Sequence, residues 1–204
     1  TIGKETNTRK VSVNNSVSIA GDISLYGGQV HNANAASLTS TAGNILLDAD
    51  VGRNLDFNGR GIEWQGDLTA SSTDSGKGNI TILARAGSDN SNNNNRINTS
   101  STTYVLQAAG DITIEALSPA YGNTGLFLGG EFRADGTLSI DGRNISTVSL
   151  LNRYGLHVLN DAVLEAAGAL SLTAKSGGGE PMALRLGNGV SITTTGTGGA
   201  APIT

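Results

Sequence analysis

Short segments in which aliphatic residues alternate with Ser or Thr recur along the chain, as in residues 23–25, 80–82, 112–114 and 170–172. Alternation with a period of two is typical of a β-strand that points aliphatic side chains to one face and hydroxyls to the other. The segments are short and are broken by Gly, Asn, Asp and Ser, which disfavours helices of about ten residues or more. We therefore expect an all-β protein whose strands have one face in the core and one in water.

Most of these segments open with the same phrase, a glycine followed by a small or polar residue and then the alternating positions. The eight copies of this glycine phrase begin at Gly21, Gly43, Gly66, Gly78, Gly110, Gly136, Gly168 and, in a weaker form, Asn188. A unit this short cannot bury its own apolar face, so it is stable only when it stacks on neighbouring copies. The repeat therefore predicts a β-solenoid.

The spacing of the copies is uneven. Successive glycines from Gly21 to Gly189 are 22, 23, 12, 32, 26, 32 and 21 residues apart. The long gap after Gly78 contains the asparagine run of residues 92–95, and low-complexity polar runs do not enter a core. We expect residues 85–103 to form a polar surface loop excursion from an otherwise regular coil.

Further related segments precede the glycine phrases in the second half of the chain. Residues 124–128, 154–158 and 182–186 form one related set, and residues 106–110, 132–136 and 164–168 form another. Each coil thus contains at least three strand-sized pieces, the number that a three-sided parallel β-helix requires. We expect about eight coils, which at about 4.8 Å per stacked strand would make a rod of about 40 Å.

Composition favours one elongated body over residues 1–204, because the repeat runs through nearly the whole chain. With 29 Gly and 37% hydrophobic residues, the chain is too turn-rich for a helical domain and too aliphatic for disorder.

A net charge of -4 offers no basic surface for nucleic acid, and no apolar stretch approaches the roughly 20 residues that would insert into a membrane. The absence of cysteine excludes disulfides and thiolate metal sites. We expect residues 196–204 to form a C-terminal turn or linker in a fragment of a longer protein.

Three phrases carry a resemblance to a known family: Ala-Gly-Asp-Ile-Thr-Ile at 109–114, Ala-Gly-Asn-Ile-Leu-Leu at 42–47 and Gly-Ala-Leu-Ser-Leu-Thr-Ala at 168–174. They are similar to the central repeats of filamentous-haemagglutinin-like large exoproteins, the adhesins of Gram-negative two-partner secretion. The likeness covers about residues 11–195. The resemblance implies a right-handed parallel β-helix, exported through an outer-membrane β-barrel transporter and used for attachment to host cells, other bacteria or matrix. The Asn-Pro-Asn motif of the family's secretion domain does not occur, so the chain resembles the central β-helix region.

Carboxylates suited to catalysis are sparse. Polysaccharide hydrolysis needs two carboxylates across a cleft, and the nearest candidates are Asp48 and Asp50, with Asp56 and Glu63 beyond them. Because Asp favours turns, we interpret Asp48 and Asp50 as closing a turn after Leu47.

Metal and phosphate sites are not indicated either. His31 and His157 lie far apart in the chain, outside any cluster with the spacing of metal ligands, and we expect surface or coil-edge positions for both. The glycines at 177–179 precede Glu180 and Pro181 instead of a helix with a Lys-Ser/Thr pair, which excludes a phosphate-binding loop. We expect no enzyme activity, no metal and no cofactor.

Planar aromatic residues and arginines on exposed faces or loops would bind a glycan or a protein through stacking and bidentate hydrogen bonds. The candidate ligand contacts are Tyr121, Arg133, Arg153, Tyr154, Arg60 and Trp64. For Trp64 a core or coil-capping position is the favoured alternative, since Trp is highly buried on average. Four asparagines lie in sequons that would accept sugar in a pathway that glycosylates them: Asn14, Asn79, Asn98 and Asn144.

The resemblance implies a segment of a secreted or cell-surface bacterial adhesin, and we expect its partner to be a surface glycan or protein. Two alternatives stay open: the stalk or receptor-binding segment of a contact-dependent growth-inhibition effector, and a polysaccharide-acting β-helix enzyme. Because the end strands of a β-helix are unpaired, we expect a monomer with a tendency to associate end to end.

Overall fold

The computed structural model of the chain describes residues 1–4, 6–32, 35–49, 61–85, 95–98, 103–118, 124–145, 154–177 and 182–196. These ranges contain twenty β-strands and no helix, so the expected all-β class is confirmed. The strand pairings within them are parallel.

The strands form three sheets, which we number by the order of their first strands. Sheet 1 has seven strands: β1 (Lys10–Val13), β4 (Gln29–Asn32), β7 (Ile62–Trp64), β10 (Asn95–Ile97), β13 (Leu126–Leu128), β16 (Leu156–Val158) and β19 (Leu184–Leu186). Sheet 2 also has seven: β2 (Val17–Ile19), β5 (Leu38–Ser40), β8 (Leu68–Ala70), β11 (Val105–Ala108), β14 (Glu131–Ala134), β17 (Val163–Ala166) and β20 (Ser191–Thr194). Sheet 3 has six: β3 (Ile23–Tyr26), β6 (Ile45–Ala49), β9 (Ile80–Arg85), β12 (Ile112–Ser118), β15 (Leu138–Asn144) and β18 (Leu170–Lys175).

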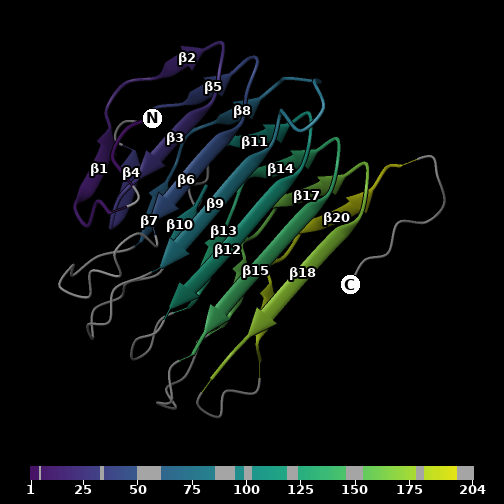
Figure 1. Ribbon diagram of the computed structural model, residues 1–204. Helices are drawn as coiled ribbons and strands as arrows, with labels where there is room; N and C mark the ends of the chain where they lie inside the picture. The colour runs from purple at the N-terminus through teal and green to yellow at the C-terminus, as the bar shows by residue number, and fades with distance from the viewer. Residues whose placement is uncertain are drawn as a thin grey trace.

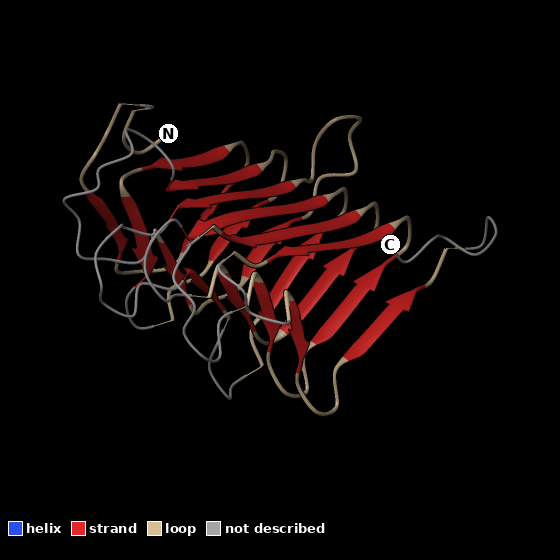
Figure 2. Cartoon of the chain, turned by 90° about the horizontal axis from the view of Figure 1, so that it is seen from below, coloured by secondary structure: helices blue, strands red, loops and turns tan. Residues whose placement is uncertain are grey.

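The chain passes through sheets 1, 2 and 3 in turn before it returns to sheet 1. Strands β1, β2 and β3 make the first three-strand coil, β16, β17 and β18 make the sixth, and β19 and β20 begin another. The coils stack along one axis as a β-solenoid, with each strand beside its equivalents in neighbouring coils (Figures 1 and 2). The expected three-sided parallel solenoid is confirmed, whereas the described strands do not confirm a stack of eight coils.

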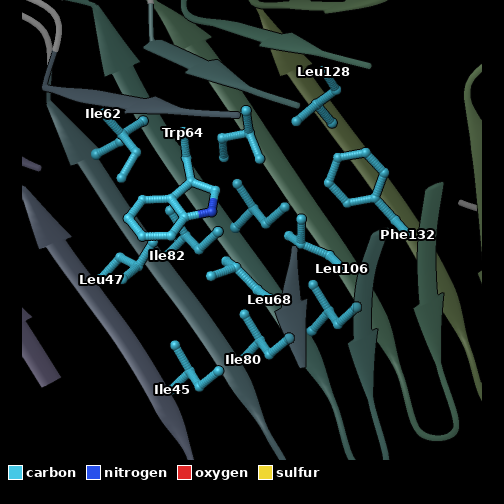
Figure 3. Packing of buried hydrophobic residues seen from close by; sticks show 14 of the residues in the cluster. Ile45, Leu47, Ile62, Trp64, Leu68, Ile80, Ile82, Leu106, Leu128 and Phe132 are labelled. Carbon is cyan, nitrogen blue, oxygen red and sulfur yellow. The ribbon is translucent and has the colours of Figure 1, made fainter. Parts of the chain in front are cut away.

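Aliphatic side chains in register fill the interior. Ile45, Ile80 and Ile112 are paired in sheet 3 and are 1%, 0% and 0% exposed. Figure 3 shows that side chains from different sheets meet in this interior, among them Trp64 of β7 and Leu68 of β8. Burial of one Ile or Leu side chain is worth about 1.5–3 kcal/mol, and every coil adds an equivalent layer. A stack of thin layers needs few large rings, which agrees with an aromatic content of 4%.

The second residue of the glycine phrase joins successive coils. The Asp22 carboxylate accepts a hydrogen bond from the Asn44 N–H at 2.8 Å, and Asn44 Oδ1 accepts one from the Asn79 N–H at 3.0 Å. Asn79 Oδ1 then accepts from the Asp111 N–H at 2.8 Å, and the Asp111 carboxylate accepts from the Thr137 N–H at 2.7 Å. We call these five residues the Asx ladder. It satisfies the backbone N–H that precedes each of four consecutive strands of sheet 3, from β6 to β15.

Glycine stands first in the phrase because the ladder leaves no room for a side chain there. A Cβ atom at Gly110 would lie 2.2 Å from Asn79 Oδ1, and one at Gly136 would lie 2.3 Å from Asp111 Oδ1. Gly21 belongs to the first coil and has no atom within 4 Å of the same position. The phrase is therefore a stacking device, in which glycine admits the acceptor that the previous coil provides.

The glycine phrase occurs in two sheets, and this explains the coil count. Six copies precede strands of sheet 3, whereas the copies at Gly66 and Gly189 precede β8 and β20 of sheet 2. Ile45 of β6 pairs directly with Ile80 of β9, so β7, β8 and β9 together make a single coil. The copies at Gly66 and Gly78 precede β8 and β9 and therefore lie in that one coil. The copies are therefore more numerous than the coils that they mark.

The other related segments pair as expected. Those around residues 124–128, 154–158 and 182–186 contain β13, β16 and β19, which are neighbours in sheet 1. Those around residues 106–110, 132–136 and 164–168 contain β11, β14 and β17, which are neighbours in sheet 2. The prediction of three strand-sized pieces in each coil is confirmed.

The expected loop excursion over 85–103 needs a correction. Residues 95–97 within it form β10, and the Ile97 side chain is 0% exposed because it packs in the core beside Trp64 of the preceding coil. Residues 86–94 and 99–102 lie outside the described part of the chain, as do residues 197–204 of the expected C-terminal linker.

Candidate functional site

A column of planar and cationic side chains lies on the outer face of sheet 1. Arg96, Phe127, His157 and Arg185 occupy the same register position on β10, β13, β16 and β19. In the first three strands the residues on either side of this position are buried, so the column faces away from the core. We call these four residues the sheet 1 column.

The column is held together by contacts between rings and guanidinium groups. The rings of Phe127 and His157 have centroids 5.1 Å apart at a tilt of 47°. The guanidinium carbon of Arg96 lies 5.8 Å from the centre of the Phe127 ring, within the range of a cation–π contact. Contacts of these kinds contribute about 0.5–1.5 kcal/mol each, so they order the side chains of neighbouring coils along the rod.

Tyr154 supports the column from the segment that leads into β16. Its ring meets the His157 ring edge-on at a centroid distance of 5.3 Å, and Arg185 lies 5.5 Å above the Tyr154 ring. Arg185 also donates a hydrogen bond to the Tyr154 hydroxyl at 3.2 Å. The Tyr154 side chain is 4% exposed, so it positions Arg185 and His157 and offers little surface of its own.

Electrostatics leave the column with permanent positive charge. Burial, and then the nearby charge of Arg185, lower the pKa of His157 below its usual value, so the imidazole is neutral at pH 7. Arg185 is exposed and forms no ion pair with a carboxylate among the described residues. The column therefore combines flat apolar surface with a guanidinium fork, a combination suited to stacking on a sugar or aromatic group and to bidentate hydrogen bonds.

Two of the sequence candidates are placed elsewhere. Trp64 is 0% exposed and its indole N–H donates to the Gly66 carbonyl at 3.0 Å, so the favoured core position is confirmed and Trp64 is not a ligand contact. Arg133 lies on the outer face of sheet 2, where it forms ion pairs with Glu131 at 2.8 Å and with Glu165 of the next coil. The hydrogen bond to Glu131 is the main cause of the raised pKa of Arg133.

Three further candidates, Tyr121, Arg153 and Arg60, lie outside the described residues. The sequence candidates omit all four members of the sheet 1 column. Three of them, Phe127, His157 and Arg185, are the fourth residues of the related segments 124–128, 154–158 and 182–186. Alternation alone places this fourth residue outward when its neighbours are core residues. Combining the alignment with that rule would have found this part of the column.

A shallow groove of about 240 Å³ lies on the outer face of sheet 3, and we call it the sheet 3 groove. Leu83, Glu115 and Asp141 line one side in register, and Leu117 and Arg143 line the other. Its carboxylates differ from the pair named from the sequence, Asp48 and Asp50.

Asp48 belongs to β6 and is half-buried on the outer face of sheet 3, so the interpretation that it closes a turn after Leu47 is wrong. The strand extends past Leu47 because Ala49 continues the inward alternation and pairs with Ala84. Asp50 and Asp56 lie outside the described residues.

Metal ligands do not gather in the described part of the chain, where no group of three or more His, Asp or Glu side chains could hold an ion. His31 is half-buried on β4, at the same register position as His157 but four coils away from it. Among the sequons, Asn98 and Asn144 are 0% and 1% exposed, and Asn79 is engaged in the Asx ladder. Asn14 is exposed.

Comparison with known proteins gives no family for this chain: no family model, no curated protein and no solved structure matches it. No helix in the described ranges has the length and apolar character needed to cross a membrane.

Proposed function

We propose that this chain is a segment of a secreted or cell-surface adhesin of a Gram-negative bacterium, and that it attaches to a glycan or protein on host cells, other bacteria or matrix. The observation that carries the proposal is the sheet 1 column, an ordered line of rings and guanidinium groups on the outside of a solenoid. Attachment of this kind is passive. The stacked coils supply a stiff body, and the outward residues supply the contacts.

Three finer features belong to the same proposal. The solenoid is right-handed, because crossovers between parallel strands of one sheet are right-handed in about 98% of cases. The parent protein leaves the cell through an outer-membrane β-barrel transporter. The segment is a monomer, and the line of contacts follows the rod axis because equivalent residues stack coil upon coil.

The test is a glycan array together with a binding assay on host and bacterial cells. We expect binding by the wild-type chain and a loss of about tenfold or more with Arg185→Ala, since exposed arginine and aromatic anchors dominate binding surfaces. Arg185→Lys keeps the charge but not the planar fork, and we expect it to lose most of the binding. Phe127→Ala tests the apolar part of the column.

The matched control is Lys175→Ala, which removes an exposed cation from sheet 3 instead of sheet 1. Each variant is first checked for an unchanged midpoint of unfolding in denaturant. If the control weakens binding as much as Arg185→Ala does, the contact is non-specific attraction and the column is not the site. If the wild-type chain binds no glycan and no cell, the segment is a spacer.

A further inference from the structure

The sheet 3 groove lies on a different face from the sheet 1 column, across strands β9, β12 and β15 at the front of Figure 1. Its floor is the backbone at Ala84 and Ala116, whose side chains point inward into the core. Its walls are outward side chains of adjacent coils, with Leu83 and Glu115 on one side and Leu117 on the other. The groove therefore runs parallel to the rod axis, between two columns of outward side chains.

Charge is unevenly distributed within the groove. Arg143 donates from Nε to both carboxylate oxygens of Asp141, at 2.9 Å and 2.8 Å, so that these two charges neutralise each other. Glu115 is exposed, and within the described part of the chain its carboxylate forms no hydrogen bond and no ion pair. It affects Arg143 only as a nearby negative charge. One carboxylate thus remains available at the middle of the groove.

Leucines flank that carboxylate on two sides. Leu83 is its register partner on β9, and Leu117 follows two residues later on the same face of β12. An arginine or lysine side chain has the complementary form, because its methylene stem packs along apolar surface while its cationic head stays at a polar end. Arginine fits better than lysine, since its fork donates two hydrogen bonds to one carboxylate.

We propose that the sheet 3 groove binds an arginine side chain presented by an extended segment of a partner protein, with Glu115 as the acceptor and Leu83 and Leu117 as the apolar clamp. The site is independent of the sheet 1 column. A partner lying along sheet 3 would leave sheet 1 free for the attachment proposed above.

The experiment is a titration followed by amide NMR spectroscopy on the full chain. The probe is the capped peptide Gly-Arg-Gly, and the comparison peptide carries citrulline, which keeps the shape of arginine without its charge. We expect the arginine peptide to shift the amide signals of Leu83, Glu115 and Leu117, and the citrulline peptide to bind at least about tenfold more weakly, because a charged hydrogen bond is worth more than one factor of ten.

Glu115→Gln removes the acceptor charge on an exposed position and should weaken the arginine peptide by about tenfold or more. Glu63→Gln makes the same change on sheet 1 and should leave binding unchanged. Equal binding of the two peptides, or wild-type affinity in Glu115→Gln, would overturn the proposal. Groove signals that move with a neutral oligosaccharide and not with the arginine peptide would also overturn it, in favour of a saccharide site. A failure of the proposed attachment through the sheet 1 column would not change the results expected from these peptide titrations.

Discussion

The role of glycine in the repeated phrase can be tested with one methyl group. The substitution Gly110→Ala places a Cβ atom 2.2 Å from Asn79 Oδ1 and 3.0 Å from the Lys77 carbonyl oxygen. The amide of Asn79 cannot simply move aside, since its Oδ1 accepts the Asp111 N–H at 2.8 Å. Relief of the clash therefore breaks the hydrogen bond of the Asx ladder between the Asp111 N–H and Asn79 Oδ1.

The expected cost follows from two terms. The lost hydrogen bond is worth about 0.5–1.5 kcal/mol, and overpacking of a tight site costs about 1–3 kcal/mol. Against this, alanine restricts the unfolded chain and stabilises by about 0.4–1 kcal/mol where the backbone tolerates it. We expect Gly110→Ala to lower the free energy of unfolding by roughly 0.5–4 kcal/mol as the difference of these terms. Gly21→Ala, with no atom within 4 Å of its Cβ, should show only the small stabilisation.

Equilibrium unfolding in guanidinium chloride gives the measurement. Trp64 is the single tryptophan and is fully buried, so its fluorescence reports the loss of the core. Adding Asn79→Ala to Gly110→Ala removes the clashing atom, so the double variant should be more stable than the sum of the single changes predicts. Equal stability of Gly110→Ala and Gly21→Ala would refute the idea that the ladder dictates the glycine.

Three further predictions concern other parts of the solenoid. Trp64→Ala should cost about 3–5 kcal/mol, measured by circular dichroism during denaturation, because a large side chain leaves a cavity between coils. Because its folded pKa is lowered, His157 binds its proton less readily in the folded state, so stability should be full above about pH 6.5 and fall as the pH drops through the folded pKa. His157→Gln should remove that part of the pH profile, and an unchanged profile would contradict the assignment. Arg133→Ala should cost less than about 1 kcal/mol in a salt-dependent way, since the side chain is 43% exposed and its ion pairs are screened.

Much of the fold follows from local chemistry in the sequence. Alternation in residues such as 112–114 identifies strands, and the repeat identifies stacking, because neither depends on distant contacts. The coil count does not follow in the same way. The phrase at Gly66 shares its Gly-Asp opening and its Thr with the phrase at Gly110, yet it precedes a strand of sheet 2. Only the pairing of Ile45 with Ile80 shows that it adds no coil.

The site was harder to predict, since it depends on register between coils. Tyr154 is a candidate because of its residue type, but its contact with Arg185 joins neighbouring coils through residues that are 31 positions apart in the sequence. Trp64 illustrates the opposite case. Its residue type favours a core position over a ligand contact, and alternation with Ile62 on β7 leads to the same conclusion.

The most direct test of the stacked architecture is a distance between two spin labels in sheet 3. The chain has no cysteine, so Ser24→Cys and Ser171→Cys provide unique attachment points. These residues share one outward column and are separated by five strand-to-strand steps, through Leu46, Thr81, Thr113 and Ser139. Both labels project in the same direction, so their separation should equal about 24 Å, five times the spacing of about 4.8 Å between paired strands. A narrow distribution near that value is the predicted result. A mean of about 29 Å, one step more, would mean that the phrase at Gly66 forms its own coil, and a broad distribution would contradict the solenoid itself.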